Sequence, residues 1–145
     1  MAMTQRDQEL TRSRRDQARP LASLGVLSAA PYRHRRDAIR ETWLRYPEVA
    51  SSAILVRFLV ARSTGANASM ATDEQHADML WLATNGSTSR IFSPLVTTYA
   101  WFVHATHTEP FASSHFVIKA DDDVFIGVPQ LARVLQGIEA TAGAD

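Results

Sequence analysis

"LASLGVLSAAPYRHRRDAIRETWLRYP" (residues 21–47) joins a short apolar run to an arginine-rich amphipathic segment. Residues 21–30 predict a buried strand, because the run is short and mostly apolar and a proline follows it. Residues 33–46 have the spacing of a helix that turns Trp43 inward and ends at Pro47. The stretch therefore predicts a strand followed by a helix that packs back on it.

The same alternation continues along the chain. Further buried strands are predicted at residues 52–62, 78–83 and 115–120, with a loop at 63–70 and a helical turn near 73–77. Alternating strands and helices indicate an α/β sandwich with a largely parallel sheet. Ligands of such sheets bind beyond the carboxyl ends of the strands.

Two later helices complete the pattern. Ser93 and Pro94 predict a helix start, as a capping residue and a first helical residue. The helix face expected to be core carries Leu95, Tyr99, Phe102, Val103 and Thr106. Pro129 predicts the start of a last helix, whose apolar stripe consists of Leu131, Val134, Leu135 and Ile138.

Length and composition favour one globular domain over residues 21–145. The chain has 145 residues, 46% of them hydrophobic, and no net charge. Residues 1–20 are expected to be a disordered polar leader, with no apolar run that could act as a signal peptide or membrane anchor. Balanced charge gives no reason to expect nucleic acid, and the lack of cysteine excludes disulfides and thiolate metal sites.

Three aspartates, Asp121 to Asp123, directly follow the strand at 115–120. Arg33, Arg36 and Arg40 follow the strand at 21–30 within two helical turns. Both groups are therefore expected at the carboxyl edge of the sheet, where helix amides also favour an anion. Arginines beside a carboxylate cluster suit a diphosphate held together with a divalent cation.

Electrostatics supports the cation. In an extended segment Asp121 and Asp123 project to one side about 6–7 Å apart, and at an effective dielectric near 20 they repel by about 2–3 kcal/mol. Carboxylate oxygens suit Mg²⁺ or Mn²⁺, which complete their coordination with water and phosphate. The alternative is that the triplet forms a solvated turn that binds nothing.

The sequence resembles a known family in several ordered segments. "RRDAIRETW" (35–43), "ADMLWLA" (77–83), "YAWF" (99–102), "FVIKADDDVF" (116–125) and "LARVL" (131–135) are similar to motifs of the β-1,3-galactosyltransferase family. The resemblance covers residues 21–138. It implies the first half of a Rossmann-like GT-A nucleotide-sugar-binding domain.

The resemblance also implies a function and a site. Galactose or an N-acetylhexosamine would pass from a UDP-sugar to a glycan, glycoprotein or glycolipid hydroxyl, in β-1,3 linkage and with inversion, in the Golgi lumen or at its membrane. Asp123, with Asp121, would bind Mn²⁺ or Mg²⁺ on the diphosphate, which stabilises the leaving group. Asp121 and Asp122 would contact the nucleotide-sugar, and Arg36 and Arg40 would line its nucleotide side.

Two features depart from the family pattern. Residues 86–94, "GSTSRIFSP", replace the family's acidic, aromatic and Asn-Leu-Thr segment. No residue matches the general base, which lies further along in the family, so the catalytic residue stays unassigned. Three hypotheses follow: a glycosyltransferase, a non-catalytic UDP-sugar or metal-binding half-domain that is inactive alone, and a structural α/β module.

Histidine and tryptophan give weaker signals. His104 and His107 share a helix face, but no third metal ligand is expected nearby, so a packing or surface role is favoured. Trp43, Trp81 and Trp101 are expected in the core rather than on a sugar-stacking surface.

Overall fold

The computed structural model describes residues 19–62, 76–83 and 92–143, and it confirms the alternation of strands and helices. The strands and helices, in chain order, are β1 (Ala22–Ser28), α2 (Arg33–Glu41), α3 (Pro47–Ala50), β2 (Ile54–Arg62), β3 (Met79–Ala83), α4 (Phe92–His107), β4 (Phe116–Asp121) and α5 (Val128–Ala142). Three 3-10 turns lie between them: η1 (Ala30–Tyr32), η2 (Trp43–Arg45) and η4 (Phe111–Ser113). The predicted loop at 63–70, most of the turn near 73–77 and nearly all of the leader lie outside the described residues.

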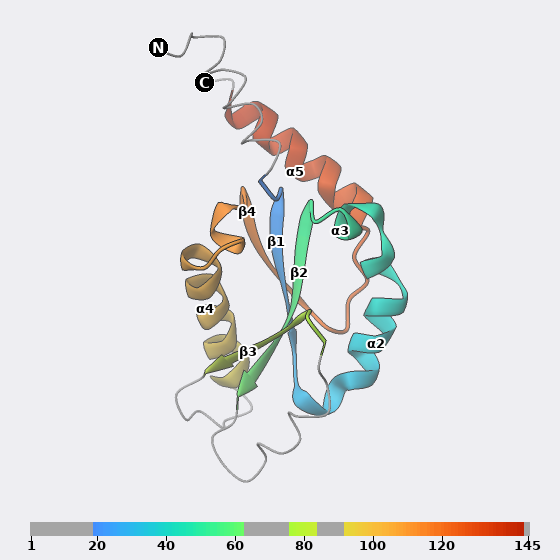
Figure 1. Cartoon of the computed structure of the whole chain (residues 1–145), viewed down its shortest axis with the longest axis vertical. Coiled ribbons are helices and arrows are strands. Elements are labelled where there is room, and N and C mark those ends of the chain that lie inside the picture. Colours follow the sequence, from blue (N-terminus) through green and yellow to red (C-terminus); the bar gives the residue numbers. More distant parts are fainter. Residues whose placement is uncertain (1–18, 63–75, 84–91, 144–145) are drawn as a thin grey trace, which may run out of the picture.

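The four described strands form one parallel sheet, as the sequence predicts, and their order is β3-β2-β1-β4. β1 lies between β2 and β4, with Leu24 opposite Val56 on one side and Ile118 on the other. All strands run toward the lower edge in Figure 1, where α2 begins. The carboxyl ends of the strands therefore share the edge at which ligand binding is expected.

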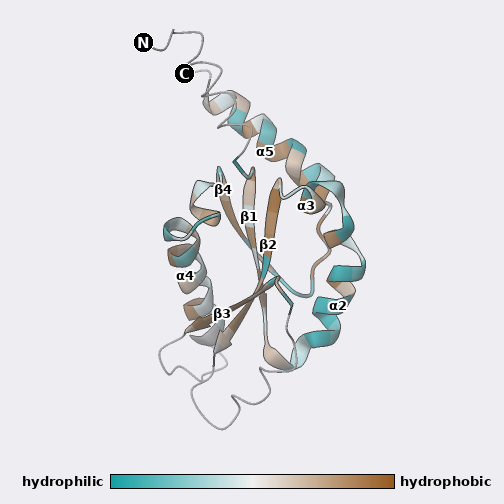
Figure 2. Cartoon of the chain, viewed as in Figure 1, coloured by the Kyte–Doolittle hydropathy of each residue, from teal (hydrophilic) through white to brown (hydrophobic). Residues whose placement is uncertain are grey.

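Helices cover both faces of the sheet (Figure 1). One core cluster joins β1 and β2 to α2, α3 and α5, and the other joins β1 and β2 to α4 and η4. In Figure 2 the strands are mostly hydrophobic, whereas much of α2 is hydrophilic. A strand buried on both faces has no polar side, which explains the nearly continuous apolar runs.

α2 is shorter than predicted. It ends at Glu41, because Thr42 leaves helical geometry with φ −114° and ψ −102°. The Thr42 hydroxyl donates to the Ala38 carbonyl at 2.6 Å, while the Thr42 amide bonds to Ile39 instead. Trp43 is nevertheless buried, as expected. Pro47 does not end this helix but begins α3, a position that proline favours because no amide is needed there.

The predicted core face of α4 is wrong. Tyr99 is 71% exposed and Leu95 66% exposed, and Phe102 and Val103 are also exposed. The buried face lies opposite and consists of Thr97, Trp101 and Ala105. α4 carries apolar residues all round, so its periodicity could not identify the face that packs on the sheet.

Gly25 of β1 explains why the other face of α4 packs inward. A Cβ at this position would lie 2.6 Å from atoms of both Leu59 and Trp101. The absence of a side chain therefore gives Trp101 its space, and the indole donates to the Ile118 carbonyl at 2.9 Å. Small residues often mark a place of close approach in a strand.

The helix termini differ slightly from prediction. α4 begins at Phe92, so Pro94 is its third residue, which is tolerated because the first-turn amides have no partner within the helix. α5 begins at Val128, and of its predicted stripe Leu135 is buried and Leu131 packs on the core. Val134 and Ile138 are exposed, because Val128 and Ala132 take the inner positions.

Candidate functional site

The candidate site lies where the order of the strands changes direction. β2 and β3 lie on one side of β1, whereas β4 lies on the other, so the carboxyl ends of β1 and β4 meet at this switch point. Leu27 pairs with Asp121, and the Asp122 amide donates to the Leu27 carbonyl at 3.1 Å. Open α/β sheets bind ligands at such a point.

Asp122 is the best-anchored member of the acidic triplet. Asp122 as a whole residue is only 8% exposed to solvent. One carboxylate oxygen accepts a hydrogen bond from the Ser28 hydroxyl at 2.6 Å, and the other accepts one from the Arg35 guanidinium at 2.9 Å. A buried carboxylate is costly unless it is paired in this way. Asp122 therefore ties the turn after β4 to the end of β1 and the start of α2.

Arg35 connects α2 to the triplet. Its guanidinium lies 4.4 Å from the centre of the Tyr32 ring and pairs with Asp122. The hydrogen bond to Asp122 raises the pKa of Arg35 above its ordinary value, although burial opposes the shift. Asp123 adds a further attractive effect in the same direction. Arg35 therefore balances the charge of the turn.

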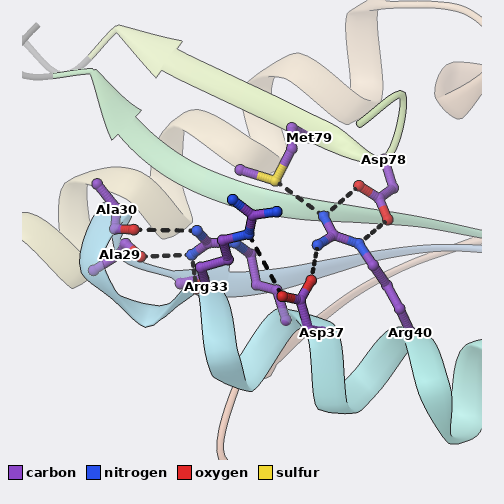
Figure 3. A network of polar contacts seen from close by, with 9 residues as sticks. Ala29, Ala30, Arg33, Asp37, Arg40, Asp78 and Met79 are labelled. Atoms are coloured by element: carbon purple, nitrogen blue, oxygen red, sulfur yellow. Dashed lines mark hydrogen bonds and ion pairs between the residues drawn. The ribbon is translucent and has the colours of Figure 1, made fainter. Parts of the chain in front are cut away.

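Arg36 lies beneath the loop after β1 and is only 1% exposed. It donates to the carbonyls of Ala29 at 2.6 Å and Ala30 at 3.1 Å, and to the Ser28 hydroxyl at 2.9 Å. Figure 3 shows the contacts to the two alanine carbonyls. These bonds satisfy loop carbonyls that have no strand partner, so Arg36 shapes the loop. Its predicted contact with a nucleotide stays a prediction.

Arg40 points to a different part of the sheet (Figure 3). Two of its nitrogens bond the two carboxylate oxygens of Asp78, each at 2.8 Å, and a third bonds Asp37 at 2.8 Å. Its guanidinium also lies 4.9 Å from the centre of the Phe58 ring. A bidentate pair of this kind is strong and directional. Arg40 therefore links α2 to the start of β3. Its predicted contact with a nucleotide also stays a prediction.

Asp121 and Asp123 are both exposed, in contrast to Asp122. Asp121 pairs with Lys119 at 2.5 Å. Asp123 makes no hydrogen bond or ion pair with any residue that the structure describes. Its carboxylate is therefore the member of the triplet most available to a ligand.

A pocket of about 460 Å³ opens beside Asp123. It lies between α2 and the segment that follows β4, and it is lined by His34, Arg35, Ala38, Ile39, Thr42, Trp43, Asp122, Asp123, Val124 and Phe125. Its lining is mostly apolar, and Arg35, Asp122 and Asp123 are its Arg and Asp side chains. An arginine and a free carboxylate at one mouth suit an anionic ligand accompanied by a cation.

The donor set fits a divalent cation held by few protein atoms. Within the described ranges, no three histidine, cysteine or acidic residues cluster into a ready-made metal site. Mg²⁺ and similar ions use one or two carboxylates and take other ligands from water and phosphate. Asp123 offers both carboxylate oxygens, which is sufficient for that mode of binding.

Comparison with known proteins agrees with this geometry. A model of the galactosyltransferase family matches residues 34–142, which include α2, the pocket and the acidic turn. The chain belongs to the galactosyltransferase family.

Three curated relatives of this chain come from Arabidopsis thaliana. Probable beta-1,3-galactosyltransferase 3 is 27% identical over 134 residues, covering 81% of this chain and 30% of the relative. Hydroxyproline O-galactosyltransferase GALT2 is 27% identical over 118 residues, covering 79% of this chain and 16% of the relative. Beta-1,3-galactosyltransferase GALT1 is 29% identical over 128 residues, covering 83% of this chain and 18% of the relative. The chain therefore spans less than a third of the length of these relatives.

The galactosyltransferase motifs occupy two regions of the structure. Arg35 and the acidic turn meet at the switch point, whereas Arg36 and Arg40 of the same motif bind the loop and β3. Arg35 belongs to the motif at 35–43, but the sequence assigned it no contact with the aspartates. Its partner is 87 residues away in the chain, so only the proximity of β1 and β4 could have indicated the contact.

The tryptophans and the pair His104 and His107 contact other parts of the fold, and Trp43 also lines the pocket. Trp43 and Trp101 are buried, as expected, and Trp81 is partly buried. His107 contacts the Val103 carbonyl within its own helix, and His104 packs near Phe111. The divergent segment at 86–94 lies mostly outside the described residues. No helix in the described part of the chain has the length and apolar character to span a membrane.

Proposed function

We propose that this chain holds the donor and metal site of an inverting hexosyltransferase that forms a β-1,3 linkage. The donor is a UDP-sugar carrying galactose or an N-acetylhexosamine, and the acceptor is a hydroxyl of a glycan, glycoprotein or glycolipid. The observation that carries the proposal is the exposed carboxylate of Asp123, which pairs with no residue in the described part of the chain, at the sheet switch point of a galactosyltransferase-family chain. The names of the Arabidopsis relatives support the linkage and the sugar.

Asp123 would bind Mn²⁺ or Mg²⁺ and orient it toward the diphosphate. When bound, the cation spreads the negative charge of the departing UDP, a Lewis-acid effect worth several kcal/mol. Asp121 lies on the same exposed turn and would join this site if it released Lys119. Arg35 keeps a positive charge beside the turn, which favours the anionic donor. No general base is assigned, and a Golgi location is proposed on family grounds alone.

Calorimetric titration with UDP, with and without Mn²⁺, tests the donor site. We expect binding that requires the metal in the unchanged chain and is lost in Asp123→Ala. Glu41→Ala is the matched control, because it also removes one exposed carboxylate but does not line the pocket. Binding that is the same without metal, or equal in Asp123→Ala and the control, would contradict the proposal.

Turnover separates an enzyme from a binding module. Formation of a glycosylated acceptor from UDP-galactose or UDP-N-acetylglucosamine and a β-galactoside, with one UDP released for each sugar transferred, would indicate transfer. Metal-dependent UDP binding without transfer would support the non-catalytic half-domain instead.

A further inference from the structure

The chain of contacts behind the acidic turn is more extensive than ligand binding by Asp123 requires. Arg36 donates to Ser28, Ser28 donates to Asp122, and Arg35 bonds the other oxygen of Asp122. The three donors come from the end of β1 and the first turn of α2. Asp122, the acceptor, belongs to the turn after β4. The network therefore joins two segments that are distant in sequence but adjacent in the sheet.

We propose that Arg35 and Ser28 are positioning residues, and that Asp122 is an anchor rather than a ligand. Both Asp122 oxygens are already bonded within the protein, and its side chain is almost fully enclosed. Anchoring Asp122 restricts the conformations of the turn, which keeps Asp123 exposed beside the pocket that it lines. The inference rests on the proposed role of Asp123 in donor binding.

The alternative is that the Arg35–Asp122 contact only stabilises the fold. Arg35 is well placed to do more, because its side chain is 37% exposed and lines the pocket beside Asp123. A contact that only supported folding would change stability without changing ligand affinity. Residues that orient metal ligands typically change metal affinity by about 10- to 100-fold when they are removed.

Arg35→Met is the test variant, because it keeps most of the aliphatic stem and removes the guanidinium. The probes are UDP titration with Mn²⁺, and hydrogen exchange of residues 121–127, which needs no ligand. We expect the metal-dependent UDP affinity to fall by about 10- to 100-fold. Exchange of the turn should become faster by about tenfold, as a contact to a charged group is lost.

Arg45→Met is the matched control. Arg45 lies in η2 and its substitution loses the same charge, but the residue is exposed and does not line the pocket. We expect near-unchanged affinity and exchange in this control. Compared with Arg35→Met, Arg35→Lys should restore part of the UDP affinity and part of the protection of the turn from exchange, because a lysine can replace the single bond to Asp122.

Ser28→Ala and Asp122→Asn keep the inference testable if Arg35→Met melts at a much lower temperature. Each of these variants should also lower the metal-dependent UDP affinity. The double variant Arg35→Met and Asp122→Asn should bind UDP no more weakly than the weaker-binding of its two single variants, because both substitutions remove the same Arg35–Asp122 contact. Wild-type affinity and exchange in folded Arg35→Met and Ser28→Ala would overturn the inference and leave the donor site intact. Failure of the unchanged chain to bind UDP with Mn²⁺ would overturn both.

Discussion

Three consecutive aspartates occupy three different environments at the end of β4. Asp121 pairs with Lys119 two residues earlier, and Asp122 is enclosed by groups from β1 and α2. Asp123 is exposed and has no described partner. The chain leaves strand geometry after Asp121, so alternation along an extended segment cannot describe all three. The three adjacent aspartates therefore differ in burial and in partners, because the neighbouring elements place different groups close to each of them.

Arg40 allows a direct test between a structural and a nucleotide-binding role. Arg40→Met removes a bidentate pair and leaves the largely buried Asp78 without its partner. We expect the free energy of unfolding to fall by about 1.5–3 kcal/mol, the range for hydrogen bonds to charged groups. Urea denaturation followed by tryptophan fluorescence measures this loss, and UDP affinity of the folded variant should not change.

Glu41→Ala serves as the control for this measurement as well. Glu41 is exposed near the end of the same helix, and its loss should change stability by less than about 0.5 kcal/mol. A large loss of UDP affinity in Arg40→Met at unchanged stability would instead support the nucleotide contact predicted from the motif.

At the scale of elements, the sequence of α4 does not show which side of the helix packs on the sheet. No Asp, Glu, Lys or Arg interrupts it and its two histidines lie in the last turn, so both sides satisfy the pattern of a core face. The side that packs on the sheet is fixed by Gly25, which lies on a strand about 70 residues earlier in sequence and admits Trp101. The existence of α4 could be predicted from its own residues, but its orientation could not.

Substitutions on the two sides of α4 should differ strongly. The double variant Leu95→Ser and Tyr99→Ser affects two exposed side chains, so we expect a change in unfolding free energy within about 1 kcal/mol. Trp101→Ala removes a fully buried side chain and should cost about 3–5 kcal/mol. Chemical denaturation measures both. A cost of several kcal/mol for the double variant would mean that this side of α4 is covered in solution.

The strands were easier to predict than the site because a strand is a local pattern. β1, β2, β3 and β4 all lie within the predicted apolar runs or extend one residue beyond them. The site depends instead on which strands become neighbours. The parallel arrangement predicted the carboxyl edge correctly for the acidic turn but not for Arg40, which pairs with Asp78 just before β3. The pairing of Arg35 with Asp122 required β1 and β4 to be neighbours, which no single segment encodes.

At the scale of the whole molecule, β1 is the strand on which both the core and the candidate site depend. It pairs with β2 and β4, and α2 and α4 pack on its two faces. Its last residues, Leu27 and Ser28, receive the acidic turn. A strand that is paired on both sides therefore supports the turn that carries Asp123.

This arrangement predicts the order in which backbone amides exchange with solvent. Amides of β1 are bonded to strands on both sides beneath two helical layers, so they should exchange last, through global unfolding. β3 has five residues and pairs only with β2 among the described strands, so it should open locally and exchange first. Hydrogen exchange of peptides covering 22–28 and 79–83 measures the difference, and Trp101→Ala should accelerate the β1 peptide more than the β3 peptide. Slower exchange in β3 than in β1 would contradict a fold centred on β1.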